Sequence, residues 1–86
     1  YNIYKDLIVP VIYSKKNCYP CNLVKNFLRG RGIQYEVRDV EDNPSYMQDV
    51  MDMGFMSVPV TIINGQPISG PNLSAIVDKL NIPSLT

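Results

Sequence analysis

The sequence has no histidine and no tryptophan, and its eight basic and eight acidic residues leave no net charge. Without histidine, the chain can form neither a Cys–His nucleophile pair nor an imidazole–metal bond. The balanced charge argues against a general nucleic-acid or membrane-surface binder, because both need a basic excess. No apolar run approaches the roughly 20 residues that a membrane-spanning helix requires. We therefore expect no nucleic-acid and no membrane partner.

Cysteine is scarce too, since the 86 residues contain only two. A chain of this length forms one domain and buries roughly 60–65% of the surface that its unfolded state exposes. We expect a single domain over residues 1–86, with a loosely ordered lead-in over residues 1–6. The apolar run Leu7–Tyr13 is too short for a signal-peptide core and has no small-residue cleavage site after it, so no secretory leader is expected.

The two cysteines belong to the motif Cys18-Tyr19-Pro20-Cys21. A structural disulfide gains most from closing a long loop, and this pair encloses only two residues. A reversible dithiol in a reducing, cytoplasmic setting fits better. The motif lies where an apolar strand gives way to a helical pattern, and a helix N-terminus favours a thiolate through its unpaired N–H groups and its dipole. The motif therefore predicts a redox site.

Hydrophobic periodicity and turn residues predict seven elements in the order β-α-β-α-β-β-α. Asn43 and Asn72 are the predicted N-caps, and Asn64-Gly65 predicts a tight hairpin. The first two strands are expected to be parallel through a right-handed crossover, and the last two antiparallel. Strands are expected at residues 7–13, 34–40, 57–63 and 66–69, and helices at 19–29, 44–53 and from the Asn72 cap to about 80.

The apolar pattern also predicts which elements are buried. The nearly unbroken strand 7–13 is typical of a sheet covered on both faces, whereas strand 34–40 alternates imperfectly and is expected near an edge. Pro10 removes a ladder donor, so it either starts its strand or lies at a bulge. The methionines of the second helix are expected to be adaptable core filler. The first helix is expected to bury one stripe of side chains, Leu23, Val24, Phe27 and Leu28.

Three motifs occur in this order along the chain. Residues 13–21 join a strand end, a lysine and Cys-x-x-Cys, residues 54–60 contain Val58-Pro59, and residues 68–73 contain a Ser-Gly turn before the last helix. Together they resemble the glutaredoxin family of the thioredoxin fold, and within it the small NrdH redoxins, which reduce ribonucleotide reductase. The resemblance extends from about residue 8 to residue 80. It implies an α/β, thioredoxin-like fold with a four-stranded mixed sheet flanked by three helices.

The resemblance implies a dithiol–disulfide oxidoreductase that reduces protein disulfides by thiol–disulfide exchange. Cys18 is expected to attack the target disulfide, and Cys21 to resolve the mixed disulfide. The cycle leaves a Cys18–Cys21 disulfide, so the protein needs an upstream reductant but no bound cofactor. We expect the protein to be a monomer that reduces disulfides of client proteins, and ribonucleotide reductase is an expected client.

Residues around the dithiol are assigned from the same resemblance. Tyr19 and Pro20 are expected to tune the pair. Pro59 is cis in the family, and the backbone of Val58 is expected to pair with an extended substrate as an added strand does. Gly70 belongs to the turn that precedes the last helix and is expected at the substrate-binding surface.

Two positions give opposite indications about the reductant. Lys15 matches the family lysine that contacts a glutathione carboxylate, and the alternative is a solvated lysine in a turn. For Lys16 these two interpretations are equally favoured. Asn72 stands near the place where glutaredoxins carry an aspartate for the glutathione amino group. A neutral N-cap explains Asn72 and favours thioredoxin reductase as the electron source, as in the NrdH type.

Two alternatives remain open. The first is a glutathione-coupled glutaredoxin, with Lys15 and Asn72 in the glutathione site. The second is a non-catalytic metal or iron–sulfur module. A structural zinc site needs four ligands, and this chain supplies two cysteines and no histidine, which leaves a cluster shared between two chains as the remaining form of that hypothesis.

Overall fold

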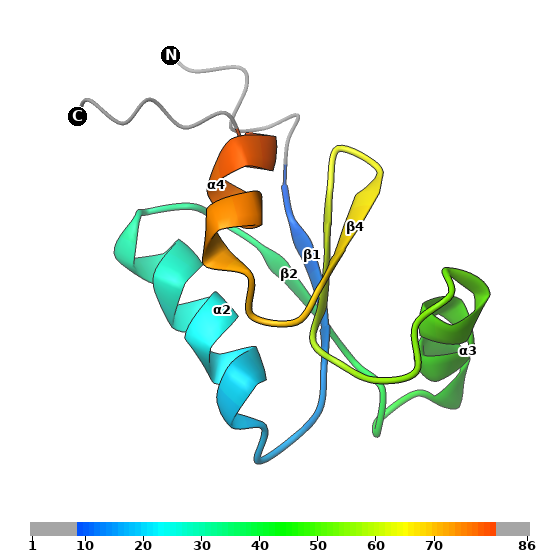
Figure 1. The fold of residues 1–86 in the computed structure, drawn as a ribbon. Helices are drawn as coiled ribbons and strands as arrows, with labels where there is room; N and C mark the ends of the chain where they lie inside the picture. The colour runs from blue at the N-terminus through cyan, green and yellow to red at the C-terminus, as the bar shows by residue number, and fades with distance from the viewer. Residues whose placement is uncertain (1–8, 81–86) are drawn as a thin grey trace.

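The computed structural model of the protein describes residues 9–80, so the expected lead-in at residues 1–6 lies outside the described residues. The predicted order β-α-β-α-β-β-α is confirmed (Figure 1). The elements are β1 Val11–Ser14, α2 Tyr19–Gly30, β2 Glu36–Asp39, α3 Pro44–Asp52, β3 Val60–Ile63, β4 Gln66–Ser69 and α4 Leu73–Leu80.

The four strands form one mixed sheet in the order β2-β1-β3-β4. Strand β1 is parallel to β2, as the crossover through α2 predicts, and antiparallel to β3. Strands β3 and β4 form the predicted hairpin, in which Asn64 has φ 52° and Gly65 has φ 80°. Two positive φ values in succession are what a two-residue hairpin turn requires, and Asn-Gly meets that need at little cost. Strand β2 lies at an edge, as its weak alternation predicts.

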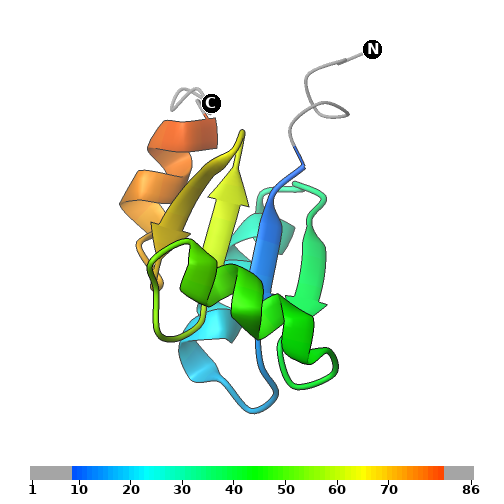
Figure 2. The same cartoon turned by 90° about the vertical axis from the view of Figure 1, so that its right-hand side faces the viewer.

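Helices cover both faces of the sheet: α2 and α4 pack on one face and α3 on the other (Figure 2). Strand β1 serves both layers, because Ile12 points to the α2/α4 side and Tyr13 to the α3 side. This explains why residues 11–13 form an unbroken apolar run. The larger core cluster consists of Ile12, Val24, Leu28, Ile63, Ile68 and Ile76, and the smaller one of Tyr13, Val50 and Val60.

Two strands begin later than predicted, and a proline explains each case. Strand β1 begins at Val11, directly after Pro10, and β3 begins at Val60, directly after Pro59. Proline has no N–H to give to a sheet ladder, so it stands before a strand more readily than inside it. Strand β2 is also shorter than the expected 34–40. The segment before Pro59 is therefore free of the sheet and available to the site.

The predicted apolar stripe of α2 is partly wrong. Leu23 is 36% exposed, and Phe27 is only half-buried. The fully buried positions are Cys21, Val24 and Leu28, so the stripe that faces the sheet includes one of the two cysteines. The methionines of α3 are likewise divided, since Met51 is exposed whereas Met47 packs against the smaller core cluster.

Candidate active site

Both cysteines lie at the N-terminus of α2. Cys18 is the N-cap, with extended φ and ψ of −113° and 106°, and Tyr19 is the first helical residue. The sulfur of Cys18 accepts a hydrogen bond from the backbone N–H of Cys21 at 3.3 Å. Pro20 occupies the first turn, where its missing N–H costs nothing. The Cys18 sulfur therefore takes the place that a serine or aspartate oxygen takes in most helix caps.

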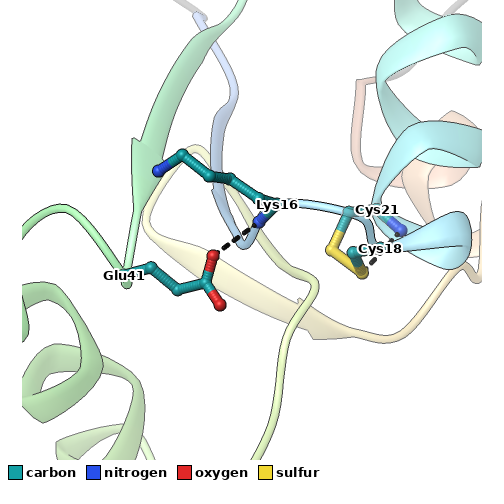
Figure 3. The surroundings of a disulfide bond; sticks show 4 residues. All are labelled: Lys16, Cys18, Cys21 and Glu41. Atoms are coloured by element: carbon teal, nitrogen blue, oxygen red, sulfur yellow. Dashed lines mark hydrogen bonds between the residues drawn. A yellow bond between two sulfur atoms is a disulfide. The ribbon is translucent and has the colours of Figure 1, made fainter.

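The two sulfurs form a disulfide, with the Cα atoms 5.2 Å apart (Figure 3). Cys21 is fully buried against the sheet, whereas Cys18 keeps 4% of its surface exposed. Tyr19, between them, is 74% exposed. The pair is therefore asymmetric: Cys18 keeps a small exposed area at the helix end, and Cys21 has none.

Sheet register brings three segments to the same end of the molecule as the disulfide. Tyr13, Val60 and Ser69 lie side by side across β1, β3 and β4. The residues that follow Tyr13 and Ser69, and those that precede Val60, leave the sheet at the same end, which is the lower end in Figure 1. The redox loop (residues 15–18), the Val58–Pro59 segment and Gly70 therefore border one region.

Val58–Pro59 is a cis peptide bond, as the resemblance implies. The carbonyl oxygen of Pro59 accepts a hydrogen bond from the N–H of Gly70 at 2.9 Å, and Gly70 has φ 76°, which suits glycine. Within residues 9–80, neither the N–H nor the carbonyl of Val58 takes part in a hydrogen bond. Val58 therefore has backbone groups available for an extended chain.

Asn72 acts as a helix cap, as predicted. Its Oδ1 atom accepts a hydrogen bond from the N–H of Ala75 at 3.2 Å, and its carbonyl accepts one from Ile76. Asn43 caps α3 in the same way, through the N–H of Ser45 at 3.1 Å. The side-chain oxygen of Asn72 is thus already used by its own helix.

The lysines beside the motif differ in their surroundings. Lys15 is exposed. The side chain of Lys16 points away from the sulfurs (Figure 3). Its Nζ lies 2.6 Å from Asp42 Oδ1 and 3.3 Å from Asp39 Oδ2. The hydrogen bond to Asp42 is the main cause that raises the pKa of Lys16 above its ordinary value, with Asp39 adding to it against partial desolvation. The ammonium of Lys16 is thus engaged by the two aspartates.

Sequence reasoning did not find the acidic partners of the redox loop. The backbone N–H of Lys16 donates to Glu41 Oε1 at 3.0 Å, and Ser14 accepts from the N–H of Val40 at 2.9 Å. The segment after β2 thus runs beside the segment after β1. The parallel pairing of these strands was the available signal, because the carboxyl ends of parallel strands meet at one edge.

Asp39 anchors this acidic segment. Its Oδ1 atom accepts hydrogen bonds from the N–H groups of Glu41 at 2.7 Å and Asp42 at 3.2 Å. Partial burial by itself raises the pKa of Asp39, but these two amides and the Lys16 ammonium outweigh it, so the pKa is lowered. The carboxylate therefore stays ionised at neutral pH and shapes the turn into α3.

Residues 9–80 contain no group of three or more histidine, cysteine, aspartate or glutamate side chains arranged to hold a metal ion. None of the helices in this part of the chain is long and apolar enough to cross a membrane.

Comparisons with known proteins agree with this geometry. The Glutaredoxin family model matches residues 11–68. The glutaredoxin-like protein NrdH of Lactococcus lactis is 32% identical over 59 residues, which are 69% of this chain and 82% of that protein. Escherichia coli NrdH is 29% identical over 59 residues, which are 69% and 73% of the two chains.

Solved structures show the same likeness in three dimensions. The Escherichia coli NrdH-redoxin superposes with a TM-score of 0.76 and 26% identity, covering 80% of this chain and 91% of that one. The thioredoxin-like protein BC3987 superposes with a TM-score of 0.76 and 25% identity, covering 81% and 97%. With its Cys18–Cys21 disulfide at the start of α2, this chain belongs to the glutaredoxin family and is a thiol–disulfide oxidoreductase.

Proposed function

We propose that the protein is an NrdH-type electron donor that reduces disulfides of client proteins in the cytoplasm, with ribonucleotide reductase as its client. The observation that carries this proposal is the asymmetric pair at the start of α2, with Cys18 capping the helix and Cys21 fully buried behind it. The relatives named NrdH support the same type of activity.

In the proposed cycle, Cys18 is the attacking residue. In the reduced protein its thiolate is stabilised by the N–H of Cys21 and by the positive end of the helix dipole. The Cys18 thiolate attacks one sulfur of the client disulfide, a mixed disulfide forms, and the other client sulfur leaves as a thiolate. Cys21 then loses its proton and displaces the second client sulfur. The client gains two electrons and two protons, and Cys18 and Cys21 are left as a disulfide.

The segments around the pair are proposed to hold the client. The unpaired backbone groups of Val58, beside Pro59, can pair with an extended client segment. Gly70, whose N–H donates to the carbonyl of Pro59, lies next to this segment. Tyr19, which is exposed, and Pro20 directly follow Cys18 in the sequence. We propose these residues as the client-binding surface.

The electron source is proposed to be thioredoxin reductase. The side-chain oxygen of Asn72 is engaged in capping α4, so Asn72 offers no carboxylate for the amino group of glutathione. The Escherichia coli NrdH-redoxin is described as having a thioredoxin-like activity profile. The exposed Lys15 favours the second candidate, a glutathione-coupled glutaredoxin, because it remains available for a glutathione carboxylate.

One assay separates the two reductants. The oxidised protein is supplied with NADPH and thioredoxin reductase, or with NADPH, glutathione and glutathione reductase, and NADPH consumption is followed in the presence of insulin as a disulfide client. We expect turnover with thioredoxin reductase and little with glutathione. Turnover with glutathione alone would contradict the NrdH-type proposal and establish the second candidate.

A further inference from the structure

The charge beside the redox loop is unusual for a site that should meet an anionic thiol. We use the name acidic clamp for three carboxylates at the end of β2 and directly after it, those of Asp39, Glu41 and Asp42. Lys16, two positions before Cys18, gives its ammonium to Asp39 and Asp42 and its backbone N–H to Glu41. The positive charge nearest to the motif on this side is therefore already neutralised within the molecule.

The clamp leaves an excess of negative charge next to the disulfide. Lys16 and its neighbour in the sequence, Lys15, carry two positive charges against three carboxylates, which gives a local charge of −1 at neutral pH. Glu41 is the carboxylate that contacts the redox loop itself, and its partner in that contact is an uncharged amide, so its charge is not cancelled there (Figure 3). Glu41 thus contributes an uncompensated charge at the approach to Cys18.

The separation is short enough for this charge to act on an incoming thiolate. Glu41 Oε1 lies 3.0 Å from the nitrogen of Lys16. Two residues span at most about 7 Å, so Glu41 Oε1 is within about 10 Å of the backbone nitrogen of Cys18. That is close to the Debye length of ~8–10 Å at moderate ionic strength, within which exposed charges still interact.

We propose that Glu41, together with the ion pairing of Lys16 by Asp39 and Asp42, selects against anionic thiols at the Cys18–Cys21 disulfide. The class that is disfavoured is a thiol of net negative charge, such as glutathione with its two carboxylates and one ammonium. Neutral and cationic thiols are favoured. This inference rests on the proposed function. It makes the charge of the acidic clamp a second determinant of the reductant, in addition to the lack of a carboxylate at Asn72.

The reaction that reports on this charge is the opening of the disulfide by a small thiol. A first thiolate attacks one sulfur of the Cys18–Cys21 disulfide, which forms a mixed disulfide and releases the other cysteine as a thiolate. A second thiolate attacks the mixed disulfide and leaves with the first as a small-molecule disulfide. Two thiols lose two electrons and two protons, and Cys18 and Cys21 gain them.

The experiment uses three thiols of similar size and different charge: cysteamine, 2-mercaptoethanol and 3-mercaptopropionate. The rate of disulfide opening is measured by acid quenching, alkylation and mass spectrometry, at low and high salt. Each rate is divided by the rate with 2-mercaptoethanol for the same variant. This ratio removes any change in the reactivity of the disulfide and leaves the effect of charge.

The informative variant is Glu41→Gln, because glutamine keeps an oxygen that can accept from the N–H of Lys16 while the charge is lost. Asp42→Asn weakens the shorter ion pair of Lys16. The matched control is Asp78→Asn, which makes the same charge change at an exposed position of α4. We expect the 3-mercaptopropionate ratio to rise roughly twofold in each clamp variant at low salt, the cysteamine ratio to fall, and both changes to shrink in high salt.

Two results would overturn the inference. One is an unchanged pair of ratios in Glu41→Gln and Asp42→Asn, and the other is an equal change in the Asp78→Asn control. Failure of the proposed function has a different signature, namely a reduced wild-type protein that leaves insulin disulfides intact. If the protein reduces insulin but the thiol rate ratios do not change in the clamp variants, the proposed function stands and only the role of the acidic clamp is contradicted.

Discussion

At the scale of single residues, the two cysteines have different surroundings although they share one motif. The sulfur of Cys18 caps the helix in a residue that keeps 4% of its surface exposed, while Cys21 is part of the fully buried stripe of α2. The pair was predictable from a local motif, and the cis bond at Pro59 was predictable from the resemblance to the glutaredoxin family. The sequence was not sufficient for Glu41, whose contact with Lys16 depends on how two strand ends meet.

Replacement of each cysteine should therefore give a different defect. Cys18→Ser should abolish reduction of insulin disulfides, because the attacking sulfur is gone. Cys21→Ser should still attack and should accumulate mixed disulfides with the client, because nothing resolves them. Insulin reduction and non-reducing electrophoresis with mass spectrometry measure the two effects. Full activity of Cys18→Ser would contradict the assigned roles.

At the scale of elements, the ends of helices and strands follow residues that act on the backbone. Asn43 and Asn72 begin α3 and α4, and Pro10 and Pro59 stand directly before β1 and β3. The caps were predictable, because a side-chain oxygen next to a helical pattern has a local partner. The strand starts were placed too early, because apolar composition continues through a proline whereas ladder hydrogen bonding does not.

The cap of α3 gives a prediction at this scale. Asn43→Ala removes the acceptor of the Ser45 N–H and should lower the free energy of unfolding by about 1 kcal/mol. Asn43→Asp keeps a hydrogen-bond acceptor, so its free energy of unfolding should fall much less. Urea denaturation followed by circular dichroism measures both variants. Equal losses in the two would show that the oxygen of Asn43 does not stabilise the helix.

At the scale of the whole molecule, one sheet of four-residue strands is shared by two core clusters. The larger cluster lies under α2 and α4, so it supports the helix that carries the dithiol. The set of side chains that α2 buries was only partly predictable from the sequence. Helical spacing selected Val24 and Leu28 correctly, but it could not show that Cys21 takes the buried place at the helix start and leaves Leu23 36% exposed.

Two leucines of the same helix test this packing. Leu28 is fully buried, and Leu28→Ala should lower the free energy of unfolding by about 2–5 kcal/mol through lost burial and a cavity. Leu23→Ala is the matched control, and it should cost less than about 1 kcal/mol, because the side chain is partly exposed. Denaturant titration of both variants gives the comparison, and similar losses would contradict the burial pattern.

The ion pair between the segments after β1 and β2 links stability to pH. The pKa of Asp39 is lowered from its ordinary 3.8, so its ionisation stabilises the fold above that value, and the contribution is lost as the pH falls through the lowered folded pKa. The raised pKa of Lys16 means that its contribution is present below its ordinary 10.5 and is lost as the pH rises through the raised value.

Asp39→Asn should therefore be less stable than the wild type at neutral pH, and the gap should narrow as the solution becomes more acidic than about pH 4. Urea unfolding across that range measures the gap, with Asp78→Asn as a surface control. A constant gap between wild type and Asp39→Asn would show that ionisation of Asp39 is not what stabilises this part of the molecule.

The short β4 strand has a further consequence. β4 forms one edge of the sheet, and Pro67 lies within it, opposite Ile62. Proline has no N–H to offer to an added strand, and the other edge, β2, carries the charged side chains of Glu36 and Arg38. Prolines and charges on edge strands are devices by which proteins avoid edge-to-edge aggregation. A molecule proposed to bind extended client chains beside Pro59 is thereby kept from adding its own copies, strand by strand, into a growing sheet.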